Sequence, residues 1–224
     1  MKRSQINALI KSTVGWLEER HVFLPPFAYW TPAEWAKKGH EYDEIRENML
    51  GWDVTDYGQG NFDDVGLLLF TIRNGNLSKA EFAKPYAEKM LISQVDQISP
   101  NHFHWNKMED IINRGGGKLF LQLWNATSKE ALADTDVTVR IDGKVCTVPA
   151  GGSVLLAPGE SITLTPGIYH LFTAKEERVL AWEVSMVNDD LTDNRFYETQ
   201  ERFTTIEEDE PAEYLLCNEY PEAK

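Results

Sequence analysis

The sequence has little cysteine and no long run of hydrophobic residues. Its 224 residues include only two cysteines, Cys146 and Cys217. Two cysteines cannot build a disulfide framework, so we expect a reducing, cytoplasmic compartment. No apolar run approaches the roughly 20 residues of a transmembrane helix, and the basic start MKRSQINALIKS breaks up before any signal-peptide core. We therefore expect no membrane partner.

Basic residues are scarce relative to acidic ones. The chain has 22 Lys and Arg against 36 Asp and Glu, a formal net charge of −14. Nucleic-acid binding depends on neutralising phosphates with Lys and Arg, so the acidic balance argues against that partner. A hydrophobic content of 42% and a charged content of 26% are ordinary for a globular protein, which excludes wholesale disorder. The remaining partner class is a small molecule.

The first 61 residues have a helical pattern. Residues 4–20 place apolar side chains at helical spacing, with Ser4 as the expected N-cap. A second helix is expected at Thr31-Pro32, with the threonine as cap and the proline at the first helical position. A third is expected over Tyr42–Leu50. These helices are too small to form their own core, so we expect a helical layer packed against the rest of the chain.

From about residue 62 the pattern changes to short β-rich runs separated by turn residues. Asp142-Gly143 between two such runs is a strong hairpin signal. Many short strands at close spacing favour an antiparallel sandwich or small barrel over βαβ units. We expect a mainly β unit over 62–187 and a packed C-terminal extension over 188–224, in which Tyr214–Leu216 could add an edge strand. The expected strands are Val65–Arg73, Tyr86–Gln97, Lys118–Asn125, Val137–Ile141, Lys144–Val148, Ser153–Leu156, Ser161–Leu164, Tyr169–Ala174 and Val179–Val187.

Three of the five histidines lie in two segments suited to a metal. His102 and His104 are two residues apart, so on a strand they share a face. Glu109 follows at a distance that allows the chain to turn and return on the neighbouring strand, and Pro166-Gly167 places His170 at the head of a later strand. Three imidazoles and one carboxylate leave two positions open on an octahedral ion. This suits Mn²⁺, Fe²⁺, Co²⁺ or Ni²⁺ better than Zn²⁺. The His-x-His pair alone fits equally well as the polar lining of a barrel end.

These two segments resemble the two motifs of the cupin superfamily, although the spacing from Pro166 to His170 is one residue shorter than the commonest form. The whole chain is similar to the D-lyxose isomerase family of cupins. The similarity includes LPPFAYWTPAEW, EKMLISQVDQISPNHFHWNKMEDIINRGGG and MVNDDLTDNRF. The resemblance implies a cupin-type antiparallel β-barrel (jelly roll), manganese and a homodimer. It also implies an aldose–ketose isomerase that interconverts D-lyxose with D-xylulose and, more slowly, D-mannose with D-fructose.

Such an isomerisation needs a base to carry a proton between C1 and C2. Glu183 is the leading candidate. It lies between Ala181 and Ser185 on one strand face, while the bulky residues of the opposite face are expected to pack under the helices. Lys107 lies between two expected ligands, so we expect its ammonium near the metal, where it would protonate or stabilise an oxygen. Glu109 enters the reaction as a ligand.

Sugar hydroxyls need polar partners, and the sequence offers weaker candidates for this role. Some lie at strand ends and some in the polar turn after the last strand of the barrel, where solvation or capping of the turn fits them equally well. Trp124 shares a strand face with Phe120 and Gln122 and would offer an aromatic platform, although aromatic residues there are more often core. His21 and His40 are expected to be structural or exposed. The candidates are Lys89, Lys118, Trp124, Asp190, Asp193 and Arg195.

Two other functions use the same features. An Fe²⁺ cupin dioxygenase would hold its iron with the same four ligands and bind O₂ at an open position. A non-catalytic sugar-binding cupin would need no Lewis acid, so the intact ligand set favours it less. The aromatic residues between positions 16 and 35 fit either a dimer interface or packing on the outer face of the barrel.

Overall fold

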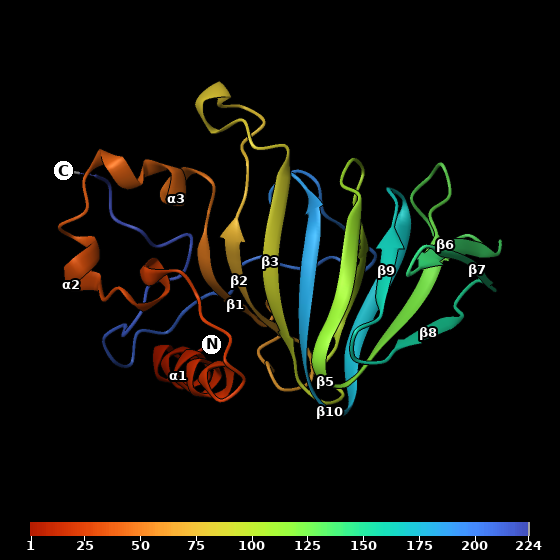
Figure 1. Cartoon of the computed structure of the whole chain (residues 1–224), viewed down its shortest axis with the longest axis horizontal. Helices are drawn as coiled ribbons and strands as arrows, with labels where there is room; N and C mark the ends of the chain where they lie inside the picture. Colours follow the sequence, from red (N-terminus) through yellow and green to blue (C-terminus); the bar gives the residue numbers. More distant parts are fainter. Residues whose placement is uncertain (224) are drawn as a thin grey trace.

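An antiparallel sheet folded over on itself dominates the computed structural model, which describes residues 1–223 (Figure 1). Its strand order is β1-β2-β3-β10-β5-β9-β6-β7, with β4 and β8 pairing to β10 and β5 and with β11 on β4. The mainly β antiparallel fold expected from the sequence is confirmed. The strands are β1 Gly51–Thr55, β2 Leu67–Arg73, β3 Tyr86–Ser93, β4 Ser99–Phe103, β5 Glu109–Asn125, β6 Val137–Ile141, β7 Lys144–Val148, β8 Ser153–Leu156, β9 Ser161–Leu164, β10 Ile168–Met186 and β11 Arg195–Phe196.

The two long strands β5 and β10 connect the two layers of this folded sheet. One half of β10 pairs with β4 and the other half with β3, while β5 follows β10 along both halves. The bend falls at the glycine cluster of β5. Gly116 has a positive φ of +91°, and a Cβ there would collide with the Arg178 carbonyl oxygen of β10. The sequence predicted two halves of β10, Tyr169–Ala174 and Val179–Val187, but only the second half of β5, Lys118–Asn125. Tertiary pairing makes each strand continuous.

The core lies between the two layers. Alternate residues of β5, Leu119, Leu121 and Leu123, are fully buried and pack with Leu69 and Leu91 from the other layer. Burial of this apolar surface is the main favourable term in folding. Because alternate residues on a strand point to opposite faces, the even-numbered residues of this part of β5 face away from the core.

The N-terminal helices cover the outer face of the sheet, as expected. Helix α1 (Arg3–Glu18) packs Ile6 and Ile10 into a second cluster with Phe70 of β2. Helix α2 (Pro32–Trp35) has the expected threonine cap, completed by a capping box with Glu34. Helix α3 spans Asp43–Glu47, and short 3₁₀ turns cover Pro26–Tyr29, His40–Tyr42 and Ala80–Phe82. None of the helices within residues 1–223 combines the length and apolar character needed to cross a bilayer.

Two local expectations in this region were wrong. Ser4 is not the cap of α1, because the helix starts at Arg3 with Lys2 in the cap position. The Ser4 amide and hydroxyl instead donate to the Asp209 carboxylate of the C-terminal segment. Strand β1 falls inside the stretch expected to be helical. Its residues alternate between apolar Trp52 and Val54, which pack with the helical layer, and polar Asp53 and Thr55, so the alternation typical of a strand was present but was overlooked.

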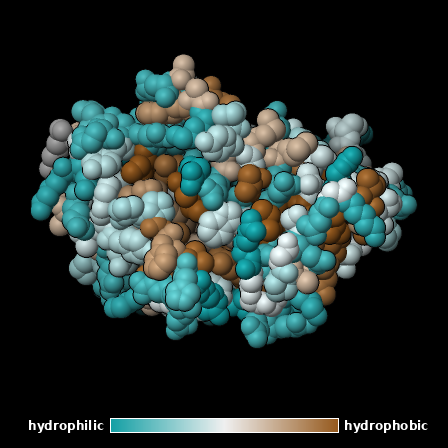
Figure 2. Space-filling model, viewed as in Figure 1, coloured by the Kyte–Doolittle hydropathy of each residue, from teal (hydrophilic) through white to brown (hydrophobic). Residues whose placement is uncertain are grey.

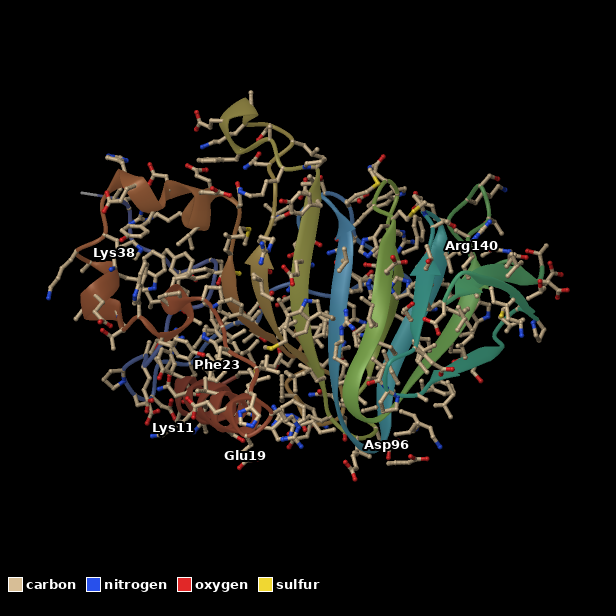
Figure 3. The ribbon with its side chains drawn as sticks, in the orientation of Figure 1. Lys11, Glu19, Phe23, Lys38, Asp96 and Arg140 are labelled. Atoms are coloured by element: carbon tan, nitrogen blue, oxygen red, sulfur yellow. The ribbon has the colours of Figure 1, made fainter. Side chains whose placement is uncertain are left out.

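The aromatic residues between positions 16 and 35 mostly pack inward. Phe27 stacks on Phe70 of β2, and Trp35 is 1% exposed and stacks on Tyr220. Phe23 is the exception, at 76% exposed. Figure 3 shows it on the helical layer, where the charged Lys11, Glu19 and Lys38 also lie. These aromatics therefore join the helical layer to the sheet.

The C-terminal extension returns across the helical layer (Figure 1, dark blue). Buried Arg3 of α1 forms ion pairs with Glu208 and Glu219. Within Tyr214–Leu216 only one isolated bridge forms, from Leu216 to Trp52, so the expected edge strand is not present there. The extension thus ties both ends of the chain together and also passes over the end of the sheet that carries the histidines, where β11 pairs with β4.

Part of the outer face of β10 remains uncovered. Val184 and Met186 are 44% and 51% exposed. Apolar atoms are visible between hydrophilic ones on the face of the molecule shown in Figure 2. The expectation that the bulky side of this strand packs entirely under the helices was therefore wrong, since only Leu180 and Trp182 contact the helical cluster.

Candidate active site

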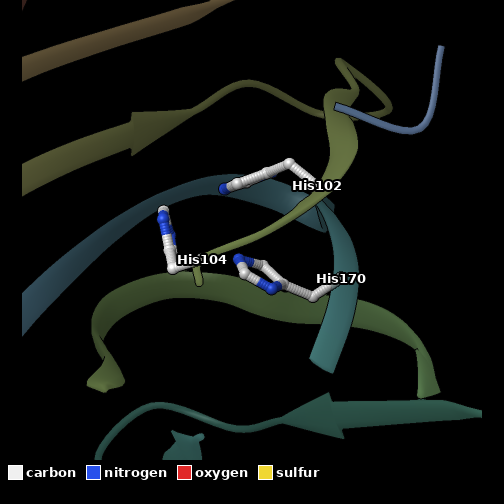
Figure 4. Close-up of side chains that lie close together, drawn as sticks. All are labelled: His102, His104 and His170. Atoms are coloured by element: carbon white, nitrogen blue, oxygen red, sulfur yellow. The ribbon is translucent and has the colours of Figure 1, made fainter. Parts of the chain in front are cut away.

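Three histidine side chains converge at one end of the folded sheet (Figure 4). His102 is the second-last residue of β4, His104 is the first residue after that strand, and His170 lies near the start of β10, paired in register with His102. One ring nitrogen from each lies within 4.8 Å of the others. The sequence predicted this group from the spacing of His102 and His104 and from the Pro166-Gly167 turn before His170, and the structure adds that β4 pairs with β10.

Backbone carbonyls fix the ring orientation of all three histidines. Nδ1 of His102, His104 and His170 lies 2.7, 2.8 and 3.1 Å from the carbonyl oxygens of Pro100, Asp193 and Ile168. A carbonyl can only accept, so each Nδ1 carries the hydrogen and each neutral ring keeps its lone pair on Nε2. Burial, with His170 and His104 nearby, holds the pKa of His102 well below its usual range, which favours the neutral ring that a metal requires.

Glu109 adds a carboxylate to this group. Its Oε1 lies 3.1 Å from His170 Nε2 and 3.5 Å from His104 Nε2. Buried Glu109 Oε1 and His104 Nε2 have no hydrogen-bond partner. Acceptors facing each other at this range repel unless a cation lies between them, so these four side chains fit a divalent metal. Glu109 begins β5, which is separated from β4 by β10, so the chain does not return on the strand directly beside β4 as expected.

Buried charges of alternating sign extend away from the histidines. Lys107 Nζ lies 2.8 Å from Glu109 and 2.7 Å from Glu183, and Lys89 Nζ lies 3.7 Å from Glu183 and 4.0 Å from Asp190. Each group therefore has an opposite charge on either side, which offsets part of the cost of burying it.

These neighbours set the protonation of the central pair. Burial opposes the charged forms of both groups, but the opposite charges outweigh it. Lys107 and Lys89 lower the pKa of Glu183, and Glu109 and Glu183 raise the pKa of Lys107. Glu183 is thus an ionised carboxylate able to accept a proton, and Lys107 is an ammonium held directly against it.

A cavity of about 50 Å³ lies among these groups. Aromatic Tyr57 and Phe196 line it together with the histidines and the buried charges. A larger cavity of about 240 Å³ shares Asn188 and Asp190 with it. Asn188 Oδ1 accepts hydrogen bonds from both Lys89 and Lys107, so it fixes the two ammonium groups at the boundary between the cavities. Of the predicted site residues, the smaller cavity contains His102, His104, His170, Glu109, Lys107, Glu183, Lys89 and Asp190.

Lys118 and Trp124 lie outside this cavity, contrary to expectation. Lys118 is half-buried and pairs with Glu176, and Trp124 packs beside Gly151. Both belong to the face of β5 that points away from the core, because the leucines of the strand occupy the inner face. The sequence showed the alternation but not which face was turned inward.

Asp193 and Arg195 also lie outside the cavity. Arg195 pairs with Glu130 near the surface. The Asp193 carboxylate accepts hydrogen bonds from the backbone amides of Asn106 and Lys107, and its carbonyl accepts one from His104. Asp193 therefore holds the loop that carries a ligand and the lysine, a supporting role that sequence position alone could not separate from sugar binding.

The cavity also contains residues that the sequence analysis missed. Asn188 and Asn194 lie in the polar turn that was already a candidate region, so composition could have suggested them. Tyr57 and Arg202 carried no local signal. Arg202 comes from the C-terminal extension and forms ion pairs with Asp53 and Asp190.

Replacing Asp193 by Ala should weaken metal binding by about 10- to 100-fold, the usual effect of losing an outer partner of metal ligands. The loop between His104 and Glu109 would lose its anchor, while all four ligands remain. Titration with Mn²⁺ measures the change. Asp189→Ala is the matched control, because the Asp189 carboxylate accepts bonds only from its own turn. Equal metal affinity in both variants would contradict the anchoring role.

Comparisons with known proteins agree on one family. The model of the D-lyxose isomerase family matches residues 1–220. The D-lyxose/D-mannose isomerase of Escherichia coli O157:H7 is 49% identical over 223 residues, which cover 98% of each chain. A protein of the same name from Serratia proteamaculans is 48% identical with the same coverage.

Solved structures show a related fold at much lower identity. An L-ribose isomerase variant from Acinetobacter sp. DL28, in complex with L-ribose, matches with a TM-score of 0.62 and 13% identity. The match covers 92% of this chain and 98% of the other. At this identity the match supports the architecture alone.

Proposed function

The chain belongs to the D-lyxose isomerase family, and from that membership we propose that it is a metal-dependent aldose–ketose isomerase that interconverts D-lyxose with D-xylulose and, more slowly, D-mannose with D-fructose. The observation that carries this proposal is the buried Lys107–Glu183 pair beside the four ligand side chains. A general base and a hydrogen-bond donor thus face the same small cavity.

His102, His104, His170 and Glu109 would hold the ion, which we propose to be Mn²⁺, with Co²⁺, Ni²⁺ or Fe²⁺ compatible with the same ligands. When bound, a divalent ion supplies Lewis-acid stabilisation for oxygens that gain negative charge. The protein's part is to orient the histidine rings through their Nδ1 hydrogen bonds, which leaves each Nε2 facing the ion, and to exclude bulk water.

Glu183 is the proposed proton carrier. Its carboxylate takes the C2 proton of the open-chain aldose, the C2 electron pair forms the C1–C2 double bond, and O1 gains a proton to give the cis-enediol. Loss of the O2 proton then forms the C2 ketone as Glu183 returns its proton to C1. The lowered pKa of Glu183 keeps it ionised and ready for the first transfer.

Lys107 is the proposed donor to O1 and acceptor from O2. In the resting site two carboxylates hold its proton tightly. When Glu183 becomes protonated, one of those negative charges disappears, so Lys107 releases its proton more readily at the moment O1 needs it. When Glu183 gives its proton back, the Lys107 ammonium is favoured again and it recovers the O2 proton.

Ketose formation from D-lyxose, D-mannose, D-xylose and L-ribose tests the function. The protein is first chelated and then assayed under nitrogen with and without added Mn²⁺. We expect ketose only with the metal, with D-lyxose the best substrate. Ketose without metal would contradict the metal dependence. Turnover that requires oxygen would indicate a dioxygenase, and sugar-dependent thermal stabilisation without product would indicate a binding protein.

A homodimer and a cytoplasmic location complete the proposal. The uncovered apolar residues Val184 and Met186 on β10 support association with a second copy. Both cysteines are free, which fits a reducing compartment.

A further inference from the structure

Arg202 lines the cavity of about 50 Å³ that also contains the three histidines. Among the other charged residues that line it, Asp190 also belongs to the C-terminal extension, and the rest come from much earlier strands and loops or from β10. The C-terminal extension carries Arg202 over the end of the sheet. Its guanidinium is 2.6 Å from Asp53 of β1 and 3.0 Å from Asp190, and these side chains are only 13%, 3% and 13% exposed. Two carboxylates thus fix the position of the guanidinium, whereas the side chain of an exposed arginine would remain free to move.

Arg202 is at the far end of the series of buried charges. Starting at the histidines, the ion pairs connect Glu109, Lys107, Glu183, Lys89, Asp190 and finally Arg202 with Asp53. The reacting C1 and C2 oxygens belong at the histidine end of this series. The part of the sugar that binds near Arg202 is therefore distant from the reacting carbons.

The Arg202 end has unused hydrogen-bonding capacity. Arg202 Nη1 is buried and has no hydrogen-bond partner, whereas Nη2 contacts both Asp53 Oδ2 and Asp190 Oδ2. Burial raises the pKa of Asp53 despite the nearby guanidinium, so this carboxylate lacks full compensation. A hydroxyl group both accepts and donates, so a sugar hydroxyl can accept from Nη1 and donate to a neighbouring carboxylate.

We propose that Arg202, held by Asp53 and Asp190, binds a hydroxyl of the sugar beyond C3 and thereby selects substrates by the far end of the chain. This inference rests on the proposed isomerase function and deepens it. Arginine suits the role because its planar donors remain charged and are fixed by two carboxylates, so little freedom is lost when substrate binds.

The test combines Arg202→Lys with D-lyxose and with its 4-deoxy and 5-deoxy analogues, each lacking one hydroxyl. We expect Arg202→Lys to lower kcat/KM for D-lyxose by about 10- to 100-fold, the effect of losing a charged hydrogen bond. For the analogue that lacks the contacted hydroxyl, the same substitution should change kcat/KM by less than about 3-fold, because the interaction is already missing. Binding of D-arabinitol, the unreactive reduced form of D-lyxose, should weaken in parallel with the loss on D-lyxose, and Mn²⁺ affinity should remain unchanged.

Arg3→Lys is the matched control. Arg3 is also buried, also pairs with two carboxylates and also anchors the C-terminal extension, but it does not line the cavity. It should leave the preference among the three sugars unchanged. An equal loss on all three sugars in Arg202→Lys, or no loss on any, would overturn the proposal. Absence of D-lyxose turnover in the unmodified enzyme would instead refute the isomerase function itself.

Discussion

Glu183→Gln is expected to abolish isomerisation while the metal remains bound. Glutamine keeps the size of the side chain and can still accept a hydrogen bond from Lys107 through its amide oxygen, but it cannot take a proton from carbon. General-base catalysis contributes about 10²- to 10⁴-fold, so kcat should fall by about that factor with little change in KM. Steady-state kinetics on D-lyxose and a parallel Mn²⁺ titration measure the two effects separately.

Glu88→Gln provides the control for this variant. Glu88 lies on β3, pairs with Arg73 and also contacts Trp182, so it shares the sheet but not the cavity. Its replacement should leave kcat within about 2-fold, as expected for a partly exposed surface pair. Full activity of Glu183→Gln would remove Glu183 from the mechanism. Loss of both metal and activity would instead assign it a structural role at the ligand group.

His104→Ala is expected to remove both metal and activity. The substitution deletes one of the four proposed ligands, so a cation beside Glu109 Oε1 would be held by one imidazole fewer. Affinity for Mn²⁺ should fall by at least about 10²-fold, and ketose formation should disappear at ordinary metal concentrations. Metal titration and activity at increasing Mn²⁺ would measure this. Partial recovery at high metal concentration is expected, because the base and the lysine remain in place.

His40→Ala is the corresponding control. His40 is exposed and contacts only Asp43 of the helical layer. It should bind Mn²⁺ and convert D-lyxose like the unmodified protein. If His104→Ala retains normal metal affinity and turnover, the three-histidine site is wrong. The two active-site substitutions thus separate metal binding from proton transfer, since only one of them removes the ion.

The candidate site was predictable where strand alternation and chain proximity determine it. His102 and His104 had to share a face of any strand that contained them. Lys107 had to stay close because two residues separate it from His104 and one from Glu109. Glu183 was predictable because small neighbours on its face left room for a buried carboxylate. Alternation could not say which face of β5 was internal, and this is why Lys118 and Trp124 were assigned to the wrong side.

The sequence by itself determined the fold class, the helical layer and the residues that can bind a metal. These depend on local patterns: apolar periodicity, turn residues and the spacing of histidines. Only the tertiary structure decided that Arg202 and Asp53 meet and that Asp193 anchors the loop between His104 and Glu109. It also decided that the Asp209 carboxylate accepts hydrogen bonds at the start of α1, where Ser4 was expected to act as the cap. Each of these contacts joins segments distant in sequence, and no local pattern encodes which distant groups the packing of the core brings together.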